Sequence, residues 1–270
     1  MKLLREILYK LDVDTIIGNT NIAISSIHFN SEEVIESALF VAIKGLNNDG
    51  HNFISKAIST GSIAIICEDL PKQTVDNVTY IQVKNSAISL ALVASNFFNN
   101  PSNNIQLIGI TGTNGKTSTA YYLFSIFKQL NFKVGLISTI ENKINNKSYP
   151  TVYTTPNPIE LNRLLSKMVD DECEFCFMEV SSHGILQNRT HGLNFNIAVF
   201  TNISRDHLDY HNSFNNYITT KKYFFDNLPT NAISIINADD THSATMVLDT
   251  NSKKIFYGIN SPSHYTARIL

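Results

Sequence analysis

The chain has 270 residues, of which 43% are hydrophobic and 16% charged, and its formal net charge is −2. This length suits one large domain or two ordinary ones, and the apolar content is typical of a chain with a packed core. The small charge, without a basic block, excludes binding of nucleic acid through a strong positive field. No apolar run reaches 18 residues, and MKLLREILYKLD predicts an amphipathic helix rather than a secretion signal. We therefore expect a cytoplasmic protein with no membrane span.

The first 98 residues predict a small α/β domain. Short apolar runs predict strands at 37–45, 62–68 and 78–83, and helical spacing predicts helices at 52–61 and 86–98. Asparagine and proline accumulate in FFNNPSNN, so a linker is expected there. The predicted organisation is a domain at 1–98, a linker at 99–104 and a second domain at 105–270.

From residue 105 onward the sequence predicts a regular alternation of strands and helices. Strand patterns cover 105–110, 133–139, 174–180, 196–203 and 232–237, and helix patterns cover 117–130, 158–171 and 213–228. Such alternation implies an α/β fold with a mostly parallel sheet covered on both faces.

The three cysteines, Cys67, Cys173 and Cys176, are too few for a disulfide framework. Core packing is their expected role, with a redox or metal role for the C-x-x-C pair as the alternative.

The stretch ITGTNGKTST, residues 110–119, is similar to a phosphate-binding loop but departs from the Walker A pattern G-x-x-x-x-G-K-[ST]. Ile110 stands where that pattern has its first glycine, which argues against the common GTPases and ATPases. A strand before the loop and a helix after it provide the context that a phosphate site requires. Lys116 can reach the β and γ phosphates, and the Thr117 hydroxyl can hold Mg²⁺. The expected nucleoside triphosphate contacts are Gly112, Thr113, Asn114, Gly115, Lys116, Thr117 and Ser118.

Further motifs follow this loop in a fixed order. They are YTTPNP (153–158), MEVSSHGILQNR (178–189), FTNISRDHLDYH (200–211) and YITTKK (217–222). Together with TGTNGKT they resemble the Mur ligases, the ATP-dependent amino-acid ligases of peptidoglycan synthesis. Within that family the closest resemblance is to the member that adds the third residue of the stem peptide. LFVAIKG and DGHNFISKA in the first domain resemble the same enzyme.

The resemblance implies a reaction in which ATP phosphorylates a carboxylate and an amine then attacks the acyl phosphate. The implied substrates are UDP-N-acetylmuramoyl-L-alanyl-D-glutamate and a diamino acid. We expect meso-diaminopimelate rather than L-lysine, on the general frequency of that choice in bacteria. The first domain would bind the UDP precursor, and the second would bind ATP with two Mg²⁺ ions. A monomer without nucleic-acid or membrane partners is expected.

The residues that the resemblance places at the reaction centre are Lys116, Glu179, His207 and Lys221. Thr117 and Glu179 would hold the first Mg²⁺ and His207 would help to hold the second. The alternatives are a capping or ion-paired carboxylate at Glu179 and an ordinary loop histidine at His207.

Lys221 matches the lysine that CO₂ carbamylates in relatives, because it lies four residues after Tyr217. A carbamate carries a negative charge and would be a ligand of the second Mg²⁺. Carbamylation needs a neutral amine, so burial must lower the pKa of this lysine. The alternative is that Lys221 and Lys222 are two solvated helix lysines.

The resemblance also assigns contacts to the UDP precursor. In the second region these are Thr154, Thr155, Ser181, Gln187 and Arg189, and a guanidinium suits carboxylates in a bidentate mode. Tyr153 stands where relatives often have Asn. In the first domain the implied contacts are Phe29, Ser31, Leu46, Asn47 and Asn48. Glu32 replaces an arginine of the family pattern there and is expected to face outward.

The family has three domains, and we expect the central one to be incomplete here and the third absent. One alternative is therefore a fragment that binds nucleotide or UDP precursor without turnover. A second is a folylpolyglutamate-type ligase, which has its loop closer to the N-terminus, and a third is a generic P-loop kinase or GTPase. The Asn237-Ala-Asp-Asp240 segment is expected either to lie near adenosine or to cap a turn.

Overall fold

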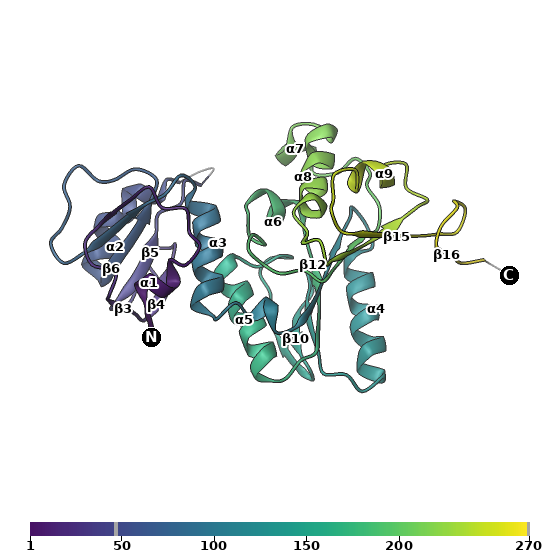
Figure 1. Cartoon of the computed structure of the whole chain (residues 1–270), viewed down its shortest axis with the longest axis horizontal. Helices are drawn as coiled ribbons and strands as arrows, with labels where there is room; N and C mark the ends of the chain where they lie inside the picture. The colour runs from purple at the N-terminus through teal and green to yellow at the C-terminus, as the bar shows by residue number, and fades with distance from the viewer. Residues whose placement is uncertain (46–47, 269–270) are drawn as a thin grey trace. The chain divides into compact units, whose positions relative to one another are not determined.

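The computed structural model describes residues 1–45 and 48–268, and its contacts divide the chain into two units (Figure 1). The first comprises Met1–Asn100 with Pro158–Asn162, and the second comprises Pro101–Asn157 with Arg163–Leu270. Each unit has its own sheet, and each is described by itself. Within the described residues, no helix combines the length and apolarity needed to cross a bilayer.

The first unit is built on a five-stranded sheet of order β2-β7-β6-β5-β4, beside a two-stranded sheet β1-β3. The strands are β1 Lys2–Leu3, β2 Thr15–Ile17, β3 Ala23–Ile24, β4 Ser26–His28, β5 Ala38–Val41, β6 Ser62–Cys67 and β7 Thr79–Gln82. Strands β4 to β7 are parallel, and β2 joins the edge in antiparallel register. The central strands β5 and β6 are almost wholly buried, which explains why they read as continuous apolar runs.

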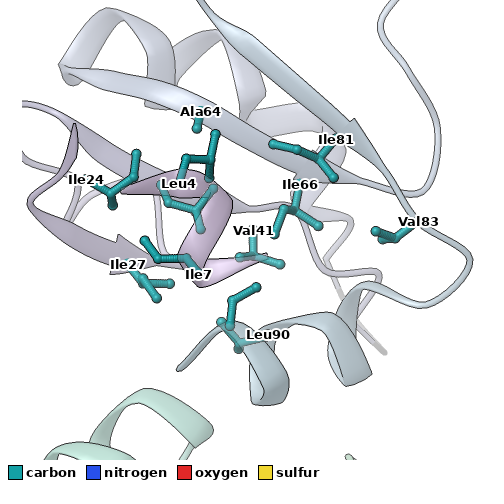
Figure 2. Packing of buried hydrophobic residues seen from close by; sticks show 12 residues of the cluster. Leu4, Ile7, Ile24, Ile27, Val41, Ala64, Ile66, Ile81, Val83 and Leu90 are labelled. Atoms are coloured by element: carbon teal, nitrogen blue, oxygen red, sulfur yellow. The ribbon is translucent and has the colours of Figure 1, made fainter. Parts of the chain in front are cut away.

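Helices cover this sheet and complete its core. They are α1 Leu4–Ile7, the 3₁₀ turn η1 Gly50–Phe53, α2 Ile54–Thr60 and α3 Ser86–Phe97. Figure 2 shows Leu4 and Ile7 from α1 packed with Val41 and Ile66 of the sheet and Leu90 of α3. Burial of such side chains contributes about 1.5–3 kcal/mol each.

The predicted N-terminal amphipathic helix is wrong in its length. Only Leu4–Ile7 is helical, because Lys2–Leu3 pairs as a strand with Ala23–Ile24. Lys10 then has a left-handed backbone with φ 61°, which a continuing helix does not allow. Tertiary pairing overrides the local helical pattern here.

The second unit is built on a nine-stranded sheet of order β11-β10-β9-β12-β8-β13-β14-β15-β16. The strands are β8 Gln106–Thr111, β9 Val134–Ile137, β10 Asn142–Ile144, β11 Lys147–Tyr149, β12 Phe175–Glu179, β13 Ile197–Phe200, β14 Ile233–Asn237, β15 Lys253–Gly258 and β16 Tyr265–Thr266. The seven strands from β9 to β16 in this order are parallel, which confirms the expected α/β class. The β10–β11 hairpin at one edge is antiparallel and was not predicted.

The helices of this unit are α4 Lys116–Gln129, α5 Pro158–Asp170 (from Arg163 onward), α6 Ser182–Leu186, α7 Leu208–His211, α8 Phe214–Asp226 and α9 Ser243–Met246, and η2 Pro101–Asn103 is a 3₁₀ turn. Residues alternate between the two faces of each strand. On β8, Ile108 and Ile110 pack against α4, whereas Gly109 lies against Phe224 of α8. On β9, Gly135 approaches Met168 of α5. The sheet is therefore covered on both faces, as the strand and helix alternation predicted.

The carboxyl ends of the parallel strands position the site. The chain leaves β8 into the loop Gly112–Gly115, and the neighbouring strand β12 ends at Glu179. From β8 the chain crosses to one side of the sheet through β9 and β12, and later to the other side through β13 and β14. Ligands of open α/β sheets bind where the strand order reverses in this way.

Candidate active site

The loop after β8 is held by the residues that follow β13. The Thr113 amide donates to the Asn202 carbonyl at 2.8 Å, and the Asn114 amide donates to the Asn202 side-chain oxygen at 3.0 Å. Thr201 Oγ1 donates to the Asn114 carbonyl at 2.7 Å. The first intrahelical bond of α4 runs from Thr119 to the Gly115 carbonyl, so the amides of the first helical turn remain available for an anion.

Gly112 has no room for a side chain. A Cβ there would lie 1.9 Å from Thr201 Oγ1 and 2.9 Å from the Asn202 carbonyl oxygen, and φ is +154°. Thr201 Oγ1 is itself bonded to the Thr111 and Asn114 carbonyls, so it has little freedom to move.

Gly112→Ala is therefore expected to lower the free energy of unfolding by about 2 kcal/mol relative to Gly115→Ala. Gly115 is also left-handed, at φ +84°, but its nearest contact for a Cβ is 4.0 Å away, so that variant carries the backbone strain alone. Urea unfolding of both variants measures the difference. Equal stabilities would show that the loop yields to a methyl group at position 112.

Two lysines meet on the carbonyl of Gly112. Lys116 Nζ donates to it at 2.8 Å and to the Thr113 carbonyl at 2.8 Å, and Lys221 Nζ donates to it at 2.9 Å. Burial lowers the pKa of Lys116, against the charges of Glu179 and Asp206. Burial also lowers the pKa of Lys221 well below its ordinary value, the positive charge of Lys116 adds to this, and Asp206 opposes it. Burial and the neighbouring charge of Lys116 thus disfavour the charged form of Lys221.

The next lysine along α8 has a different environment. Lys221 is 1% exposed and its Nζ lies 4.7 Å from the ring centroid of Tyr217. Lys222 instead forms ion pairs with Asp226 and Asp249 at the surface. The helical turn of roughly 100° per residue separates the two side chains.

Glu179 is a fully buried carboxylate at the end of β12. It accepts hydrogen bonds from Thr117 Oγ1 at 2.9 Å and from the Thr139 amide at 2.8 Å. Thr139 Oγ1 in turn donates to Thr154 Oγ1 at 3.0 Å. Two of the expected metal ligands, Thr117 and Glu179, are therefore brought into contact, together with one residue expected to bind the precursor.

A second polar network starts from the Thr155 side chain, which is fully buried. Thr155 Oγ1 donates to the Glu179 carbonyl at 2.9 Å and accepts the Ser181 amide at 3.0 Å. Ser181 caps α6 by accepting the Gly184 amide at 3.1 Å. Arg189 donates to the Thr155 carbonyl at 2.6 Å and to the Gln187 side-chain oxygen. All four precursor residues predicted at these positions thus form one connected group.

His207 lies in an aromatic cluster and has a left-handed backbone, with φ 53°. Its ring centroid lies 5.0 Å from that of His183 and 6.2 Å from that of Tyr217. His207 and the Lys221 amine therefore flank the same Tyr217 ring. Among the residues that the structure describes, no group of three or more His, Cys, Asp or Glu side chains is arranged to hold a metal.

The precursor residues expected in the first unit are placed as follows. Phe29 is 38% exposed, Ser31 is buried and Asn48 is exposed. Leu46 and Asn47 lie outside the described residues. Glu32 is exposed and pairs with Lys56 at 3.2 Å, as expected for a side chain that faces outward.

Several residues of the site were not singled out from the sequence. They are Thr139, His183, Thr201, Asn202 and Asp206. Tyr153 was noted only as a departure from the family pattern. Asn202 and Asp206 stand inside the quoted motif FTNISRDHLDYH, and Thr139 is the last residue of a predicted strand, so position alone was a usable signal. Asp239 accepts three backbone amides, from Ile259, Asn260 and Ser261, and so acts as a turn cap.

The cysteines are free and buried, as expected. Burial raises the pKa of Cys67 and of Cys173 to about 11, and it raises the pKa of Cys176 further. A thiolate is therefore disfavoured at all three positions, which supports core packing over redox chemistry.

The loop joins a strand to a helix at the point where the strand order of a parallel sheet reverses, and a buried carboxylate contacts its threonine. These features define a phosphate-loop protein of the α/β class. The chain belongs to the Mur ligase family. The family's middle-domain model matches residues 110–270, and a second model, described as the Mur ligase family catalytic domain, matches residues 23–108. The resemblance found in the motifs is confirmed.

Individual relatives agree with this assignment. The UDP-N-acetylmuramoyl-L-alanyl-D-glutamate–2,6-diaminopimelate ligase of Bacteroides fragilis is 45% identical, over 99% of this chain and 55% of the relative. A solved structure of a ligase with the same name superposes with a TM-score of 0.80 at 22% identity, over 96% of this chain and 53% of the other. The MurF ligase of Thermotoga maritima in complex with ADP superposes with a TM-score of 0.58 at 25% identity, over 87% and 51%. The chain thus spans about half the length of these relatives.

Proposed function

We propose that this chain carries the ATP site and the precursor-binding residues of a ligase that joins meso-diaminopimelate to UDP-N-acetylmuramoyl-L-alanyl-D-glutamate. The proposal rests on one observation about the loop after β8. Lys116 and Lys221 both donate to the Gly112 carbonyl, and Glu179 accepts a hydrogen bond from Thr117. The name of the Bacteroides fragilis relative supports the choice of substrates. We further propose that the enzyme acts as a cytoplasmic monomer.

The phosphate loop performs the ATP-binding part of this function. Free amides at the start of α4 and its positive dipole end suit the phosphates. Lys116 Nζ is held by two loop carbonyls and would turn from them to a phosphate oxygen. The residues from Gly112 to Ser118 are the proposed nucleotide contacts.

Thr117 and Glu179 fit a Mg²⁺ ion. They supply a hydroxyl and a carboxylate oxygen in contact, and the buried Glu179 carboxylate also lies within electrostatic reach of Lys116. Mg²⁺ takes few protein ligands and keeps its remaining positions for water and substrate phosphates. The ion would neutralise charge on the transferring phosphoryl group. We propose His207 and a carbamate on Lys221 as ligands of a second ion.

The carboxylate substrate would be held beside the nucleotide. Thr154 is linked through Thr139 to Glu179, and Arg189 is linked to Thr155, so both precursor residues attach to the strand that ends at the metal position. In the proposed reaction the precursor carboxylate attacks the γ-phosphorus and ADP leaves, and the amine then attacks the acyl phosphate carbon and phosphate leaves. The protein contributes positioning and charge neutralisation. Phe29, Ser31, Leu46, Asn47 and Asn48 are proposed to bind the UDP part.

Isothermal titration calorimetry of the folded chain tests this proposal. We expect UDP-N-acetylmuramoyl-L-alanyl-D-glutamate to bind with a dissociation constant of roughly micromolar size, about −8 kcal/mol. UDP-N-acetylglucosamine, which lacks the peptide carboxylates, is the matched control and should bind at least about tenfold more weakly. Equal affinities would remove the peptide from the proposed substrate, and no binding of either ligand would contradict the precursor site altogether.

A further inference from the structure

Arg189 is held in one orientation by three neighbours. Its Nε and Nη2 donate to the Gln187 side-chain oxygen at 2.9 and 2.6 Å, and its Nη1 donates to the Thr155 carbonyl at 2.6 Å. Gln187 is itself oriented, because its Nε2 donates to the Tyr210 hydroxyl at 2.8 Å. The Tyr153 ring covers a face of the guanidinium, with its centroid 4.8 Å from the central carbon.

These contacts leave the arginine with unused capacity for an anion. A guanidinium has five N–H donors. Three are used here, so one N–H on each terminal nitrogen remains for a ligand. Burial lowers the pKa of Arg189, and the other groups that act on it within the described part of the chain are the two tyrosines, Tyr153 and Tyr210. No carboxylate neutralises it there.

Tyr153 contributes little to the core. The residue is 54% exposed, and within the described part of the chain its ring stacks on Arg189. Its backbone carbonyl accepts a hydrogen bond from Thr151, which any residue at position 153 would retain. A stack of this type strengthens when water is excluded, and a bound ligand would exclude water.

We propose that Tyr153 is a positioning residue that presents the Arg189 guanidinium to a carboxylate of the precursor, a role that rests on the proposed function. The ring closes a face of the guanidinium plane while Gln187 and Thr155 hold its edges. The free N–H groups are thereby directed to one place, and less conformational entropy is lost when the carboxylate binds. Tyr153 acts through Arg189 and does not itself contact the carboxylate.

A double-mutant cycle separates this role from direct contact with the ligand. Tyr153→Ala is expected to weaken precursor binding about fivefold, and Tyr153→Phe, which keeps the stack, by less than about twofold. In an Arg189→Met background, Tyr153→Ala should change precursor affinity by less than about twofold. ATP affinity should be the same in the wild type and in all four variants, because the phosphate loop is unchanged. Calorimetry with the precursor and with ATP gives every value.

A fivefold effect of Tyr153→Ala that persists in the Arg189→Met background would overturn the proposal in favour of direct stacking on the ligand. A second readout needs no precursor. In ¹⁵N relaxation of the arginine Nε–H groups, Arg189 should be ordered in the wild type and in Tyr153→Phe, and mobile in Tyr153→Ala. An equally ordered Arg189 in Tyr153→Ala would overturn the positioning role of Tyr153, whether or not the wild type binds the precursor. Failure of the wild type to bind the precursor would instead contradict the proposed function.

Discussion

Replacing Lys116 with methionine is expected to weaken binding of MgATP by about 100-fold. A hydrogen bond from an ammonium to a phosphate is worth about 1.5–3 kcal/mol, and Lys116 is the lysine at the start of α4 beside the loop. The fold should persist, because Lys221 still donates to the Gly112 carbonyl when Lys116 is removed. Calorimetry with MgATP measures the change.

Lys128→Met is the matched control for this variant. Lys128 lies in the last turn of the same helix and is exposed, so its removal alters net charge equally but should leave MgATP affinity within about twofold. If Lys116→Met and Lys128→Met bound MgATP equally, the loop would bind nucleotide without its lysine and the proposed contact would be wrong.

Lys221→Met is expected to make the protein more stable while removing its capacity for a carbamate. Lys221 is 1% exposed, and burial lowers its pKa well below its ordinary value. Replacing a buried ionisable group by an apolar one of similar size commonly stabilises a protein, here by about 2–4 kcal/mol at neutral pH. Urea unfolding in CO₂-free buffer measures this gain.

The pH dependence of this gain has a definite sign. Between the lowered pKa of Lys221 and its ordinary value of 10.5, the unfolded chain binds a proton that the folded chain does not. Stability therefore rises with pH across this window in the wild type. The advantage of Lys221→Met should shrink as the pH rises through 10.5, because Lys221 is neutral in both the folded and the unfolded wild type above that pH. An advantage that is independent of pH would show that Lys221 is not held neutral by the fold.

Lys222→Met is the control variant, and it is expected to change the free energy of unfolding in the opposite direction. This neighbouring lysine pairs with Asp226 and Asp249, so its loss should destabilise the protein by about 0.5–1 kcal/mol. After incubation with ¹³C-bicarbonate, a carbamate signal is expected in the wild type and in Lys222→Met but not in Lys221→Met. A signal that survives in Lys221→Met would place the modification on another lysine.

The sequence predicted most of the second unit because its information is local. The alternation of strands and helices located β8, α4, β9, α5, β12, β13, α8 and β14, and the loop was recognised from its residues and from the strand and helix around it. The family followed from the order of the motifs. The prediction failed at Lys2–Leu3, where pairing with the distant Ala23–Ile24 outweighs the local helical preference. It also missed the β10–β11 hairpin, which is a local pairing. The Asn145-Asn146 turn between β10 and β11 was a sequence signal for the hairpin that the prediction did not use.

What the sequence by itself determined was the class of fold, the family and the identity of the loop, because hydrophobic period and motif order are properties of neighbouring residues. Only the tertiary structure decided that Lys221 is buried against Gly112 while Lys222 reaches surface carboxylates. It also decided that Thr139 meets Glu179 and that Tyr153 stacks on Arg189. These contacts join segments far apart in the chain, and they arise because parallel strands end at one edge of the sheet and bring their following loops together.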